Sequence, residues 1–221
     1  MEELELKGRI LAMARSQPSP DRPTLRRQAR WVMSLAAVVV LVVFLSFGGF
    51  RAWGAPRPPA LIALTTGGTL AIAVWTFALL RRRAQALVGP DSRTLATTVV
   101  LVPLASFTWK VSWSLLFAGS SVWWADRPGL RCFGLSMLLS LLVFAAVLVL
   151  GRRTDPVHPA SRGAALGVAS GAAGATLMDL WCPVGHPVHV LLGHILPLLL
   201  LALLGASLGR FILDLPADDE A

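Results

Sequence analysis

The chain has 221 residues, of which 55% are hydrophobic and only 14% are charged. A soluble domain normally has about a quarter of its residues charged, and the apolar residues here form long blocks instead of the alternation of half-buried strands. The composition therefore excludes an ordinary soluble domain and indicates an integral membrane protein. The net charge of +8 is explained by topology and by anionic lipid near the helix ends. Direct nucleic-acid binding is not favoured, because no basic stripe lies on a soluble element.

Residues 1–31 are predicted to form a cytoplasmic N-terminal tail, with no cleavable signal peptide. Residues 2–15 have an amphipathic helical pattern, and the stretch SQPSPDRP after them is typical of a linker. Two interpretations of this helix remain open, a helix on the membrane surface and a docking segment for a cytoplasmic protein. Its acidic first turn and mixed polar face favour docking, since membrane-surface helices usually carry Lys and Arg on that face. The candidate partner-binding residues are Leu4, Leu6, Ile10, Leu11 and Met13.

Six segments qualify as membrane spans, for which a helix needs about 20 mostly apolar residues. They must be helical, because backbone groups in lipid have to be hydrogen-bonded within the segment. The fifth is rich in Gly and Ala, and its strip of small residues predicts close packing on neighbouring helices, which favours counting it as a span. The predicted spans are 32–50, 60–80, 95–117, 133–150, 163–180 and 188–208, forming a transmembrane domain over 32–208 that is followed by a C-terminal tail over 209–221.

The positions of Lys and Arg predict the orientation of the spans. Most of these residues fall in the two tails and in the loops on the same side, whereas the opposite loops contain Arg51, Arg57, Arg127 and Arg131. Loops rich in Lys and Arg stay in the cytoplasm, and an even number of spans places both tails on one side. The sequence therefore predicts an all-α, six-helix bundle in the bacterial inner membrane with both termini in the cytoplasm.

The two cysteines, Cys132 before the fourth span and Cys182 after the fifth, are both predicted at the outer surface. Thiols on the oxidising face of a bacterial inner membrane can pair, so a disulfide or redox role is one interpretation, and two free buried cysteines are the other. Cys182, His186 and His189 form a Cys-x3-His-x2-His pattern of ligands suited to zinc or another thiophilic metal. The spacing matches no established zinc motif, so ordinary interfacial histidines are the competing interpretation, and no other cofactor is predicted.

Lys110 lies inside the third span, where a charge is costly unless it is paired or reaches water. Asp179, near the outer end of the fifth span, is a candidate partner, and extension of the lysine to the outer surface is the alternative. A proton or ion pathway requires more intramembrane polar groups than this pair. The chain also has no CxxC, no HExxH and no Gly-rich phosphate loop, so the sequence does not predict an enzyme.

The stretch from Gly163 to Arg210 combines a Gly/Ala-rich helix, a Cys-Pro step, a Pro-containing turn and a Gly-punctuated last helix. In this stretch, and in Arg131-Cys132 at the start of a Leu-rich helix, the chain resembles NrsF-type polytopic membrane anti-sigma factors. The resemblance covers roughly residues 95–210, and the light-responsive carotenoid regulator CarR has the same gross layout. Trp181 departs from the His of many relatives, which weakens a metal argument carried over from them.

The resemblance implies a negative regulator of transcription. Its short cytoplasmic N-terminus would sequester an extracytoplasmic-function sigma factor, and an outer-face or intramembrane stress signal would release it, with Cys132 and Cys182 as candidate sensors. The rival hypothesis is a small-molecule transporter or channel subunit. Such a protein should contain inverted-repeat halves with interrupted helices, and residues 32–117 and 133–208 show no such symmetry.

Overall fold

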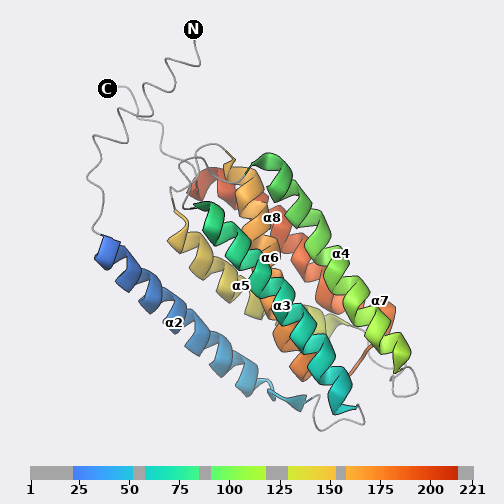
Figure 1. The fold of residues 1–221 in the computed structure, drawn as a ribbon. Coiled ribbons are helices and arrows are strands. Elements are labelled where there is room, and N and C mark those ends of the chain that lie inside the picture. Colours follow the sequence, from blue (N-terminus) through green and yellow to red (C-terminus); the bar gives the residue numbers. More distant parts are fainter. Residues whose placement is uncertain (1–21, 52–57, 85–90, 118–128, 153–157, 214–221) are drawn as a thin grey trace, which may run out of the picture.

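The computed structural model describes residues 22–51, 58–84, 91–117, 129–152 and 158–213, and all regular structure in these ranges is helical. Six helical rods, each long and apolar enough to cross a membrane, form one bundle (Figure 1). This confirms the six apolar helices predicted from the sequence. The rods are α2 (Arg22–Ser46), α3 (Pro59–Ala84), α4 (Ser92–Leu116), α5 (Leu130–Leu150), α6 (Pro159–Trp181), and a sixth composed of α7 (Pro187–Val190), the π turn η4 (Leu191–Ile195) and α8 (Leu196–Ile212).

Helix α6 lies at the centre of the bundle and contacts α3, α4, α5 and α8. Its glycines allow this, because a Cβ atom on Gly163 would overlap the carbonyl oxygen of Gly205, and one on Gly167 would overlap that of Leu201. The backbones of α6 and α8 therefore touch directly, which is the packing that small residues provide in lipid. The strip of small residues predicted for the fifth span is thus the central contact surface of the fold.

Helix α2 lies on the outside of the bundle (Figure 1) and packs chiefly on α5. Its buried side chains include Val40 and Phe44, whereas much of its apolar surface is exposed, as suits a helix that faces lipid. The helix begins at Arg22, ten residues before the predicted span. Residues 22–31 include good helix formers, and Pro23 lies in the first turn, where proline is tolerated. It is followed by Gly48 and Gly49, whose positive φ angles of 97° and 45° no other residue adopts as readily.

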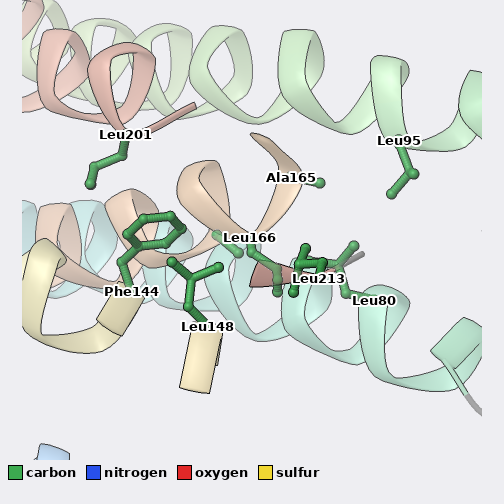
Figure 2. Close-up of a cluster of buried hydrophobic side chains, with 9 residues drawn as sticks. Leu80, Leu95, Phe144, Leu148, Ala165, Leu166, Leu201 and Leu213 are labelled. Carbon is green, nitrogen blue, oxygen red and sulfur yellow. The ribbon is translucent and has the colours of Figure 1, made fainter. Parts of the chain in front are cut away.

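The two ends of the bundle differ in charge and in chemistry. Helix α2 begins and α8 ends at one end (Figure 1), here called the Arg-rich end after Arg27, Arg30, Arg93, Arg152, Arg162 and Arg210. A cluster of buried apolar side chains lies in the interior near this end (Figure 2). It is formed by Leu80, Leu95, Phe144, Leu148, Ala165, Leu166, Ala169, Leu201 and Leu213. The opposite end, where α5 begins and α6 ends, is here called the cysteine end after Cys132 and Cys182.

Candidate functional site: a buried cysteine and histidine cluster

The cysteine end brings together two thiols that are 50 positions apart in the sequence. Cys132 lies in the first turn of α5, and Cys182 directly follows the last residue of α6. Their Sγ atoms are 3.3 Å apart, and both side chains are buried. The sequence predicted their common location, and the structure places them close enough to act as a pair.

Two histidines complete the cluster. The Nε2 atom of His189 in α7 lies 3.2 Å from Cys182 Sγ, and the His194 ring is 5.7 Å from the His189 ring, centre to centre. The four candidate ligand atoms of Cys132, Cys182, His189 and His194 all lie within 4.8 Å of one another, and all four residues are buried. His194 Nε2 is a buried nitrogen with no hydrogen-bond partner among the described residues.

The local backbone explains how histidines five positions apart reach the same cluster. Pro197 has no N–H to donate to the carbonyl of Gly193, so regular α-helical bonding fails there. The chain instead forms the π turn η4, which contains Gly193 and His194; such single π turns occur frequently at functional sites. Gly193 is required by packing as well, because a Cβ atom on it would lie 3.0 Å from the Cβ of Cys132.

The sequence-predicted metal set of Cys182, His186 and His189 is only partly brought together. His186 lies before α7, where its Nδ1 accepts a hydrogen bond of 3.3 Å from the backbone N–H of Val188 and caps the helix. The cluster contains His194 and Cys132 in its place. His194 was absent from the predicted set because ordinary helical spacing from His189 does not direct it to the thiols. The sequence feature that could have indicated an irregular turn near His194 is Pro197, three residues after it.

A second buried group adjoins the cluster and involves the predicted intramembrane pair. Lys110 Nζ in α4 lies 2.8 Å from Asp179 Oδ1 in α6, and both side chains are almost fully buried. Lys110 also donates to the carbonyl of Ala175 at 3.1 Å, and Thr69 Oγ1 of α3 donates to Asp179 Oδ2 at 2.9 Å. Of the two arrangements that the sequence left open, the structure contains the ion pair, and Lys110 does not extend to the surface.

The donor set determines what this cluster can do chemically. Two thiols and two imidazoles form one of the standard zinc ligand sets, and soft sulfur donors also suit other thiophilic metals. Cys182 lies between the two candidate spans that flank it. Hydrogen bonding to Cys132 and to His189 holds the pKa of the Cys182 thiol well below its ordinary value, against the opposing effect of burial. A thiolate is the form that binds metals and reacts with oxidants.

The candidate partner-binding residues Leu4, Leu6, Ile10, Leu11 and Met13 lie outside the described residues. Comparison with known proteins gives one finding: the family model NrsF, described as negative regulator of sigma F, matches residues 12–214. No curated protein and no solved structure matches the chain. The matched region contains all six helical rods and the cysteine and histidine cluster.

Proposed function

Since the chain belongs to the NrsF family, the negative regulators of sigma F, we propose that it is an inner-membrane anti-sigma factor that sequesters an extracytoplasmic-function sigma factor. The family match over residues 12–214 is the observation that carries this proposal. The six apolar helices support a site of action at the bilayer. A regulator with this function needs a cytoplasmic segment that binds the sigma factor, an element that receives a signal, and a connection between them.

The Arg-rich end of the bundle is proposed to face the cytoplasm, since Lys and Arg next to helix ends mark the cytoplasmic side. Both tails then lie in the cytoplasm, the compartment that contains the sigma factor. The amphipathic pattern of residues 2–15 supports docking of its apolar side chains into a groove of the sigma factor, as amphipathic helices do. The proposed contacts are Leu4, Leu6, Ile10, Leu11 and Met13.

The cysteine end is proposed to face outward and to receive the signal. The clustering of Cys132, Cys182, His189 and His194 within 4.8 Å supports binding of a thiophilic divalent cation such as Zn²⁺ or Cd²⁺ at these four residues. The buried Nε2 atom of His194 supports this further, because a buried nitrogen is costly when poorly hydrogen-bonded, and among the described residues its ring has only the thiol of Cys182 as a side-chain partner on the cluster's side.

Helix α2 is proposed to connect the two ends. Val40 and Phe44 of α2 belong to the same apolar cluster as Cys132 and Cys182, and α2 begins at Arg22, within the predicted cytoplasmic tail. A change in the geometry of the thiols would therefore alter the surface on which α2 rests. Switching a sigma factor from almost fully bound to almost fully free requires about 5 kcal/mol of differential stabilisation, which tight metal binding is able to supply.

The sigma-binding step is tested by isolating the intact protein from native membranes and identifying what accompanies it by mass spectrometry. A sigma factor should accompany the intact protein and be absent with a variant that lacks residues 1–15. A variant that lacks residues 214–221 is the matched control and should retain the sigma factor. If no sigma factor accompanies the intact protein, the anti-sigma assignment is wrong, and transport assays become the appropriate next experiment.

The signal step is tested by adding Zn²⁺ or Cd²⁺ to membranes that contain the complex. The cation should release the sigma factor from the unsubstituted protein and not from the Cys132→Ser variant. His186→Asn is the matched control, because it alters a histidine of the same segment outside the cluster and Asn preserves the helix cap. Release that is equal in all three proteins would exclude the cluster as the point of signal entry.

A further inference from the structure

The buried ion pair next to the cluster holds together three helices at one point. Lys110 extends from α4, Asp179 from α6 and Thr69 from α3, and the three residues are each at most 4% exposed. Both carboxylate oxygens of Asp179 are bonded, one to Lys110 Nζ at 2.8 Å and the other to Thr69 Oγ1 at 2.9 Å. Ionisable residues inside a membrane are rare and usually functional. This fully hydrogen-bonded ion pair is therefore expected to have a role besides packing.

His194 lies between this pair and the thiols, with its two nitrogens in different surroundings. Its Nδ1 atom is 3.4 Å from Lys110 Nζ and 4.0 Å from Asp179 Oδ1. Its Nε2 atom, at the other side of the ring, has no hydrogen-bond partner among the described residues. The ion pair therefore contacts one edge of the imidazole and leaves the other edge available to the cluster.

We propose that Lys110 and Asp179 are positioning residues of the metal site, which fix the His194 ring so that Nε2 serves as a ligand together with Cys132, Cys182 and His189. This inference rests on the metal-binding part of the proposed function. A histidine that binds a metal through Nε2 carries its proton on Nδ1 and usually donates that proton to a carboxylate or carbonyl group. Asp179 Oδ1, 4.0 Å from Nδ1, is the carboxylate placed to accept this proton once the metal is bound, and Thr69 and Lys110 hold that carboxylate in place. Lys110 Nζ, at 3.4 Å, only donates, so binding of a metal through Nε2 requires Nδ1 to turn its proton from Lys110 toward Asp179.

A purely structural role for the pair makes a different prediction. Replacing a buried ion pair by apolar residues of similar size is often neutral or stabilising. The double variant Lys110→Met/Asp179→Leu should therefore remain folded whether or not the pair positions His194. Metal affinity separates the two roles, because loss of a group that orients a ligand typically weakens metal binding about 10- to 100-fold.

The experiment is a titration of the purified full-length protein with Co²⁺, followed by the absorption bands of thiolate-bound, four-coordinate cobalt. Asp179→Asn and the double variant should bind Co²⁺ about 10- to 100-fold more weakly than the unsubstituted protein, and the double variant should resemble His194→Ala in affinity and spectrum. Thr69→Val, which removes the bond to Asp179, should weaken binding less. Thr65→Val is the matched control, because Thr65 bonds only the backbone of its own helix, and it should bind as the unsubstituted protein does.

The outcomes separate this inference from the proposed function. If the double variant is folded and binds Co²⁺ with unchanged affinity and spectrum, the pair does not position His194, while the metal site itself stands. If the unsubstituted protein binds no Co²⁺, both this inference and the metal-binding signal are wrong, while sequestration of the sigma factor is still judged by the isolation experiment. Rescue of affinity in Asp179→Glu relative to Asp179→Asn would further support a carboxylate in the positioning role.

Discussion

Helices α2 and α6 both qualify as membrane spans, yet their surroundings are opposite. In the most apolar stretch of α6, 83% of the residues are buried, against 11% in α2, although α6 is the least hydrophobic of the six spans. A core helix of a soluble protein is usually the more hydrophobic one. In lipid, outward-facing side chains meet hydrocarbon as apolar as the protein interior. High hydropathy here therefore marks the helix that faces lipid, and small residues mark the buried helix.

The same comparison assigns different mechanical roles to the two helices. Helix α6 contacts four neighbours along its length, so its position is fixed by the whole bundle. Helix α2 rests chiefly on α5, and its most buried side chain, Phe44, lies in the cluster that also contains Cys132 and Cys182. Helix α6 is thus held by the whole bundle, whereas α2 is held mainly by α5 and by the apolar cluster that also contains the two cysteines.

The largest difference is expected when the same side chain is shortened in both helices. Met178 of α6 is fully buried, and Met33 of α2 is 42% exposed. Met178→Ala should lower the free energy of unfolding by about 2–5 kcal/mol, since it leaves a cavity in a packed interior. Met33→Ala should cost less than about 0.5 kcal/mol, as surface substitutions usually do. Equilibrium unfolding in detergent measures both values, and similar costs at the two positions would refute the contrast between central and outer helix.

The second prediction adds one methyl group instead of removing atoms. Gly167→Ala should destabilise the protein by about 1–3 kcal/mol, because the new Cβ would overlap the carbonyl oxygen of Leu201. Gly67→Ala in α3 is the matched control, since no atom outside its own helix lies within 4 Å of the added Cβ. It should be neutral or stabilise by up to about 1 kcal/mol through helix propensity. Thermal unfolding midpoints in one detergent compare the two variants, and an equal loss would show that the α6–α8 contact is looser than described.

Much of the fold was predictable because a bilayer restricts the options so strongly. Length and hydropathy identified six helices, and the glycines of the fifth span, such as Gly163 and Gly167, indicated which helix packs most closely. Which helices pack against each other could not be predicted, since nothing in the sequence of α2 indicates that it packs on α5. The start of α2 at Arg22 was also missed, because hydropathy ends where the apolar block ends, while hydrogen bonding continues the helix into polar residues.

The candidate site was predictable in its parts and not in its assembly. Cys132, Cys182, Lys110 and Asp179 stood out as residues that are unusual in or beside a span, and the structure brings them together in pairs. His194 was not selected, because its approach to the thiols depends on the π turn Leu191–Ile195 that precedes Pro197. A sequence pattern based on regular helical spacing does not contain that turn.

The smallest effect is expected at the attachment of α2 to α6. Trp181, the last residue of α6, donates from Nε1 to the carbonyl of Phe47 at 2.7 Å, just after α2 ends. Trp181→Phe removes this bond while it keeps most of the ring, so the attachment should weaken by about 1 kcal/mol. Local opening should become about fivefold more frequent, and the amides of Phe47, Gly48 and Gly49 should exchange with deuterium faster in proportion. Exchange measured by mass spectrometry in detergent reports this value.

Trp31→Phe in α2 is the matched control, because Trp31 is 68% exposed and lies at the Arg-rich end. It should leave exchange at the end of α2 unchanged. Faster exchange throughout α6 in Trp181→Phe would mean that the bond stabilises α6 and does not specifically attach α2. Unchanged exchange at residues 47–49 would mean that the bond from Trp181 does not hold that end. Because Trp181 directly precedes Cys182, faster exchange confined to the end of α2 would identify a second route, besides Phe44, by which a change at the thiols reaches α2.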